Sequence, residues 1–122
     1  MKRASALAIL VVSLVPTIAC SLLENQARNT AAALSGSIVA AQGKYLASCT
    51  ANPAQEICRL INRGVSGENA LITAIETYCG WSSTLVPPDP KATCVPVKTA
   101  EAALRAAIAN AATLTMQIKG AL

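Results

Sequence analysis

The stretch AEAALRAAIANAATLTMQIKGAL, residues 100–122, decides the fold of this chain. One set of its residues recurs alternately four and three positions apart, which is the spacing of one face of an α-helix. The members of this stripe are Leu104, Ile108, Ala111, Thr115, Ile118 and Leu122. Thr99 lies just before the stretch and is a suitable N-cap residue. The sequence therefore predicts a helix over residues 100–119 that packs its stripe against a core.

A second stripe lies over residues 22–47, where the sequence predicts another helix. Its members near one helical face are Leu23, Ala27, Leu34, Ile38, Ala41 and Tyr45. Asn52 and Pro53 then suit the cap and the first position of a next helix, and Gln55 can reach back to the cap's backbone amide. We expect this helix to bury Ile57, Leu60 and Ile61.

Glycines in the middle of the chain predict the ends of two helices. Gly64 can end the helix that begins at Asn52, and Ser66 can cap a further helix that ends at Gly80. The residues that this third helix would bury are Leu71, Ile72, Ile75 and Tyr78. Alanine supplies much of the apolar content and favours helix over strand. The prediction is an all-α domain, a small up-down bundle of about four helices.

A proline-rich loop of residues 81–97 precedes the last predicted helix. Its prolines exclude both a helix and a central strand; they are Pro87, Pro88, Pro90 and Pro96. The loop also carries Trp81, Leu85 and Val86, which either seal the end of the bundle or contact a partner protein.

Residues 1–19 have the order of an export signal: Lys2 and Arg3, an apolar stretch, and small residues up to Ala19. The apolar stretch is shorter than the roughly 20 residues that a membrane-spanning helix prefers. The alternative is an N-terminal anchor that is not cleaved. We predict a signal peptide over residues 1–19 and a single mature domain over residues 20–122.

The processing site Thr17-Ile18-Ala19-Cys20 resembles the lipobox of bacterial lipoproteins, although that family usually has Leu where Thr17 stands. The resemblance covers only the first 20 residues. It implies that Cys20 receives a diacylglyceryl group and, after cleavage, an N-acyl chain. Ser21 in place of Asp is compatible with sorting to the outer membrane. An ordinary signal peptidase can also cut after Ala19, which leaves a soluble periplasmic or secreted protein as the alternative.

Four cysteines remain once Cys20 is set aside: Cys49, Cys58, Cys79 and Cys94. In an oxidising compartment they can form two disulfides. The short loops favour Cys49–Cys58 and Cys79–Cys94, whereas an antiparallel four-helix topology brings all four toward one pole and leaves Cys49–Cys79 open. Metal binding is disfavoured because the chain has no Cys-x-x-Cys pair and no histidine.

The same absence of histidine removes the usual general base, so we expect no enzyme and no cofactor. The mature chain keeps a formal charge of only +2 once Lys2 and Arg3 leave the +4 of the whole chain, and its cations are scattered, so no nucleic-acid partner is expected. The expectation is a non-catalytic envelope module that is tethered by lipid and contacts an unknown envelope protein, with self-association through alanine-rich helix faces as a further reading. The alternatives are a binding module for an apolar small ligand and a surface exclusion or inhibitor factor.

Overall fold

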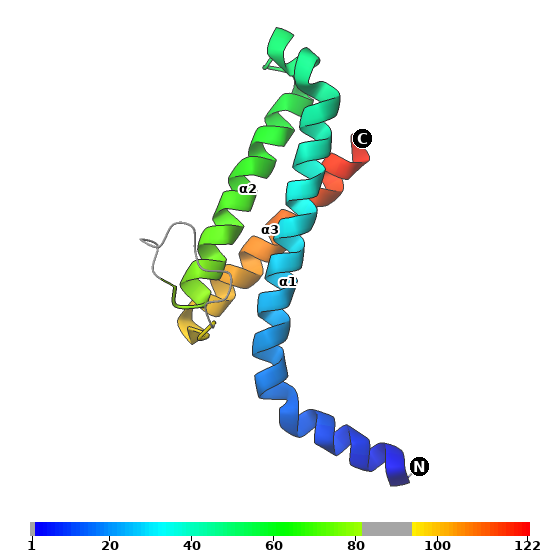
Figure 1. The fold of residues 1–122 in the computed structure, drawn as a ribbon, viewed down its shortest axis with the longest axis vertical. Coiled ribbons are helices and arrows are strands. Elements are labelled where there is room, and N and C mark those ends of the chain that lie inside the picture. The colour runs from blue at the N-terminus through cyan, green and yellow to red at the C-terminus, as the bar shows by residue number, and fades with distance from the viewer. Residues whose placement is uncertain (1, 82–93) are drawn as a thin grey trace.

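The computed structural model describes the backbone of residues 2–81 and 94–122 and the side chains of residues 22–81 and 94–122. It contains the helices α1 (Lys2–Ala51), α2 (Glu56–Tyr78) and α3 (Glu101–Gly120), with the 3-10 turn η1 (Lys98–Ala100) directly before α3. α1 and α2 run antiparallel, and α3 crosses both obliquely (Figure 1). All regular elements in the described ranges are helical, so the predicted all-α class is confirmed.

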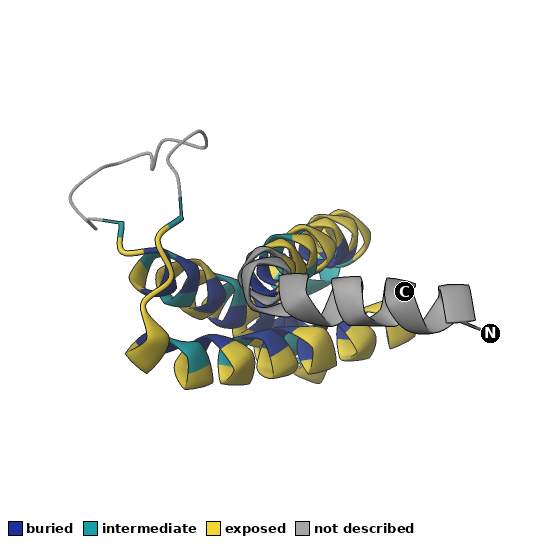
Figure 2. Cartoon of the chain, turned by 90° about the horizontal axis from the view of Figure 1, so that it is seen from below, coloured by how far each residue is buried: buried dark blue, intermediate teal, exposed yellow. Residues whose placement is uncertain are grey.

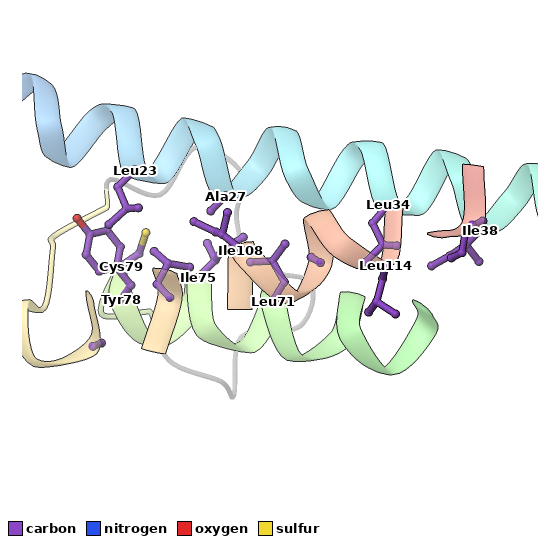
Figure 3. Close-up of a cluster of buried hydrophobic side chains, with 14 of the residues drawn as sticks. Leu23, Ala27, Leu34, Ile38, Leu71, Ile75, Tyr78, Cys79, Ile108 and Leu114 are labelled. Carbon is purple, nitrogen blue, oxygen red and sulfur yellow. The ribbon is translucent and has the colours of Figure 1, made fainter. Parts of the chain in front are cut away.

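The core lies between the three helices, whose outer sides are exposed (Figure 2). Leu34, Leu71 and Leu104, one from each helix, are fully buried. Figure 3 shows side chains of α1 pointing toward those of α2 and α3. The predicted stripes of the first and last helices are confirmed, except that Tyr45 is half-buried and Leu122 is 46% exposed. In α2, Ile61, Leu71, Ile75 and Tyr78 are buried as predicted, Ile57 and Leu60 are half-buried, and Ile72 is exposed.

The predicted helix break at Gly64 and Ser66 is wrong, because α2 continues through both residues. Gly64 and Gly67 allow neighbouring helices to pack closely on α2 and do not form a turn. A Cβ atom on Gly64 would lie 2.8 Å from Ile118 Cδ1 and 3.2 Å from Ile38 Cγ1, and a Cβ on Gly67 would collide with Leu114 Cδ1. Glycine at these two positions lets α1 and α3 approach the backbone of α2. The described residues therefore form a bundle of three helices where the sequence predicted about four.

The uninterrupted α2 also separates the two disulfides, which join Cys49 to Cys58 and Cys79 to Cys94. These are the pairings that the sequence favoured. The four-helix topology predicted that all four cysteines lie toward one pole, and this prediction is wrong. Cys58 and Cys79 lie at opposite ends of α2, about 30 Å apart along its axis. The expected end of the helix at Gly80 is confirmed, since Gly80 takes the left-handed φ of +69°.

The predicted caps form differently. α2 begins at Glu56, three residues later than Pro53, and Asn52 Oδ1 accepts a hydrogen bond from Ala54 N (3.3 Å) in the turn before it. Gln55 Oε1 accepts from Ser48 Oγ (2.7 Å), which ties the end of α1 to the start of α2. Thr99 lies inside η1 and makes no capping bond there.

Of the predicted proline-rich loop, residues 82–93 lie outside the described residues, and these include Pro87, Pro88, Pro90, Leu85 and Val86. The described end of the loop is irregular and runs back along the end of α2. Val95 N donates to Cys79 O (3.2 Å), and Val97 N donates to Tyr78 O (2.7 Å). Together with the Cys79–Cys94 disulfide, these bonds fix the entry into α3.

Candidate functional site

Trp81 is the aromatic residue that the sequence singled out, and it follows directly on the left-handed Gly80. Its backbone N–H donates to Glu76 O (2.9 Å), which holds the residue against the end of α2. The side chain is half-buried and packs against the core. Trp81 therefore covers part of the bundle end, which is one of the two alternatives that the sequence offered, and keeps part of its surface accessible.

The part of α1 around Arg28 packs on the same residue. The Arg28 guanidinium lies over the Trp81 ring, 5.0 Å from its centroid, and Arg28 Nε donates to Glu24 Oε1 (3.1 Å). A cation over an indole face is attracted by the ring quadrupole. Glu24 stands four residues before Arg28, which is the favourable order for an ion pair on a helix. This chain of contacts fixes the position of the indole from two helices.

Apolar side chains surround this corner of the bundle. Ile72, Val95 and Val97 are 39%, 66% and 37% exposed. Gly80 is close to the last two, since a Cβ there would lie 3.5 Å from Val95 O and 3.7 Å from Val97 Cγ2. We call the set of Arg28, Ile72, Trp81, Val95 and Val97 the Trp81 end. A surface groove of about 260 Å³ crosses it, lined by Arg28, Ala31, Ile72, Ile75, Glu76 and Trp81.

Glu24 also approaches the Cys79–Cys94 disulfide, with a carboxylate oxygen and both sulfur atoms within 4.8 Å of one another. Three such ligand atoms can hold a metal ion when the cysteines are thiolates. Here the two sulfurs are bonded to each other, and Glu24 is paired with Arg28. The cluster therefore acts as a structural junction between α1, α2 and the segment before α3.

Cys20, the predicted lipidation site, lies within the backbone span of α1, and its side chain lies outside the described residues. Glu24 follows four residues later, a rise of about 6 Å along the helix. Leu85 and Val86, the other predicted contact residues, cannot be placed with Trp81 because they lie outside the described residues.

The opposite end of α1 is closed by polar contacts with the end of α3. Lys44 Nζ donates to Leu122 O (2.6 Å), and the Tyr45 hydroxyl donates to the Ala121 carbonyl. The Cys49–Cys58 disulfide secures the neighbouring turn. A groove of about 290 Å³ lies here, with Tyr45, Leu46 and Pro53 among its lining residues.

The structure also bears on the alternative of an apolar ligand held between the helices. Leu34, Ile75 and Ile108, which would line such a void, are buried in the core cluster. The four described grooves open at the surface, and neither Leu34 nor Ile108 lines any of them. Over the described residues, every buried side-chain nitrogen and oxygen has a hydrogen-bond partner, so no orphaned polar atom marks a ligand position either.

Sequence reasoning found Trp81 but missed Arg28 and Glu24 as its neighbours. The four-residue spacing of these two charges permits a helical ion pair, but only the packing of α1 on α2 brings that pair to the indole. No helix among the described residues is long and apolar enough to cross a membrane. No family model, no curated protein and no solved structure matches the chain.

Proposed function

We propose that this chain is an exported, non-catalytic module of the bacterial cell envelope, held on a membrane by lipid at Cys20 and acting by contact with another envelope protein through the Trp81 end. The N-terminal order of cations, apolar stretch and small residues before Cys20 supports export. Of the five cysteines, only Cys20 is left after two disulfides are formed, which fits a cysteine that carries lipid.

One observation carries the choice of surface. Arg28, about two helical turns after Cys20, lies over the Trp81 ring, and Glu24, about one turn after Cys20, lies beside the Cys79–Cys94 disulfide. An anchor at Cys20 therefore keeps this end of the bundle close to the bilayer, and a partner that binds it is itself embedded in the membrane or lies against it. Aromatic, aliphatic and arginine side chains are the types that dominate binding energy in protein interfaces.

The anchor is tested by replacing Cys20 with Ser in the full chain and fractionating the cells. We expect the parent in the membrane fraction after a carbonate wash and the Cys20→Ser variant in the soluble envelope fraction, because a single acyl group already binds bilayers and several anchor stably. Replacing Cys79 and Cys94 together by Ser is the control, since it also exchanges cysteine for serine but leaves Cys20 in place and no unpaired partner behind. Equal membrane retention of the parent and the Cys20→Ser variant contradicts lipid anchoring.

The contact surface is tested by crosslinking intact envelopes and identifying what is captured with the tagged chain. Val95→Glu places a charge on the Trp81 end at a side chain that is 66% exposed, so the fold tolerates it. We expect this variant and Trp81→Ala to lose a partner that the parent captures. Asn62→Glu, at an exposed residue near the Cys58 end of α2 and away from the Trp81 end, is the control that keeps it. A captured set that is the same in all four chains rejects the Trp81 end as the contact surface.

A further inference from the structure

The outer face of α1 is an exposed stripe with the spacing of a coiled-coil seam. Its positions follow one another by three and four residues, and each one is exposed. They are Leu22, Asn25, Asn29, Ala32, Gly36, Val39, Gly43, Leu46 and Thr50. The large apolar members Leu22, Val39 and Leu46 are 60%, 64% and 68% exposed. Helices that pair along their length carry their contact residues at this spacing, and here large apolar residues lie at three of the nine positions, beside small and uncharged polar ones.

Two glycines on this face have no explanation within the single chain. A glycine inside a helix lowers stability relative to alanine. In α2 the cost has a visible cause, because side chains of α1 and α3 occupy the space beside Gly64 and Gly67. Beside Gly36 and Gly43 nothing lies within 4 Å of an added Cβ atom. They lie seven residues apart, on the same side of the helix, where only an approach from outside the chain would use the missing side chains.

The same face carries no charge at any of its positions. This matters for one class of partner in particular. In a symmetric pairing of two parallel helices each residue meets its own copy, so a charged residue on the seam would meet an equal charge. The outer face of α1 meets this requirement over residues 22–50, whereas the exposed side of α2 carries Glu56, Arg59 and Arg63.

We propose that two copies of this chain associate through the outer faces of their α1 helices, in parallel and in register. In that arrangement Val39 of one copy inserts into the hole formed by residues 36, 39, 40 and 43 of the other. Those residues are Gly36, Val39, Ala40 and Gly43, so the hole is lined chiefly by glycine and alanine. Because Gly36 and Gly43 have no side chains, they leave room for Val39 of the other copy.

The polar residues of the seam select the parallel direction. When the two helices are parallel, Asn29 meets Asn29, and an amide can both donate to and accept from its own copy. When they are antiparallel with Leu22 against Leu46, Asn29 faces Val39 and its amide is left without a partner, which is costly in an interface. A parallel pair also places both Cys20 residues at the same end, as a common membrane surface requires under the proposed function.

The size of the face sets the expected strength. From Leu22 to Thr50 the helix is about 42 Å long, and a strip about 10–12 Å wide along it gives roughly 900 Å² buried over both copies. That value lies below the roughly 1,200–2,000 Å² of stable specific interfaces and within the range of weak, transient ones, so we expect association no tighter than micromolar in solution.

The test is the mass of the purified full chain, measured by sedimentation equilibrium in density-matched detergent from about 1 to 200 µM, a range that brackets the micromolar association expected from the interface size. Gly36→Glu and Gly43→Glu place charges on the seam in space that is open within one chain. Ser66→Glu, on the exposed side of α2, is the matched control. We expect a monomer–dimer equilibrium for the parent and the control, and monomer throughout for the two seam variants, with no loss of thermal stability at the lowest concentration. A mass that the seam variants share with the parent, whether monomer or oligomer, overturns the proposal.

The direction of pairing has its own test. A cysteine replacing Leu22 lies against its copy in the parallel pair, whereas in the antiparallel pair the two cysteines are about 36 Å apart. Oxidation should give a covalent dimer of Leu22→Cys in excess of any that the parent forms through Cys20. No such excess overturns the parallel arrangement.

Discussion

Alanine at Gly64 tests whether the glycines of α2 are packing positions. A Cβ there would lie 2.8 Å from Ile118 Cδ1, 3.2 Å from Ile38 Cγ1 and 3.4 Å from Ile38 Cδ1. Carbon atoms prefer separations of about 3.5–4.0 Å, and neither isoleucine can turn toward solvent, because Ile118 is 0% and Ile38 is 4% exposed. Overpacking of this kind costs about 1–3 kcal/mol, and the better helix propensity of alanine returns about 1 kcal/mol. We expect Gly64→Ala to lower the free energy of unfolding by roughly 1 kcal/mol, which is a Tm decrease of about 4–8 °C.

The comparison that isolates this effect is the same change at Gly36, where nothing lies within 4 Å of the added atom. Gly36→Ala keeps only the propensity gain, so its Tm should rise by about 4–8 °C. Both are measured by circular dichroism at 222 nm, without reductant, at about 1 µM, where the micromolar association proposed above does not contribute. The packing explanation is refuted if Gly64→Ala is as stable as Gly36→Ala.

Three further outcomes follow from the packing. Leu34→Ala should lower the free energy of unfolding in urea by about 2–5 kcal/mol, because Leu34 is 0% exposed. Leu46→Ala, at a residue 68% exposed, should stay within about 0.5 kcal/mol of the parent, and equal effects of the two changes would contradict the assigned core. Replacing Cys79 and Cys94 together by Ser should remove about 3 kcal/mol, as expected for a closed loop spanning 15 residues, and unchanged melting would deny that bond a structural role. Arg28→Ala should lower the free energy of unfolding by about 0.5–1 kcal/mol and change the fluorescence spectrum of the single tryptophan. An unchanged spectrum would contradict the contact between Arg28 and the Trp81 ring.

The sequence predicted which faces of α1 and α3 are buried because both helices carry regular stripes. Large apolar residues such as Leu34 and Leu104 recur at helical spacing among small or polar neighbours. Such a helix removes them from water by burying that one face. The disulfide partners followed from short loops, since Cys58 lies 9 residues and Cys94 lies 15 residues after its partner.

The failure at Gly64 has a physical cause. Glycine is favourable both just after a helix, where φ is positive, and inside a helix, where another element approaches its backbone. Gly80 is the first case and Gly64 the second, and only the side chains of Ile38 and Ile118 distinguish them. Those side chains are far from Gly64 in the sequence. The wrong number of helices, and the single pole predicted for four cysteines, both follow from that ambiguity.

The candidate site was predictable only in part for a similar reason. Trp81 is conspicuous in a chain that has one tryptophan and no phenylalanine. That Arg28 covers its ring depends on the register between α1 and α2, which buried residues such as Ala27 and Ile75 set jointly. A sequence pattern reports the face of each helix, whereas register depends on how the faces fit together.

Export, lipid anchoring and the disulfides together determine the covalent state of the chain in its native membrane, and intact mass spectrometry measures that state. Chain extracted from envelopes without reductant should begin at Cys20, carry the added mass of acyl groups, and be lighter by four hydrogens for the Cys49–Cys58 and Cys79–Cys94 bonds. A mass equal to that of all 122 residues, still beginning at Met1 and with five free thiols, would contradict export, anchoring and the disulfide-closed bundle together.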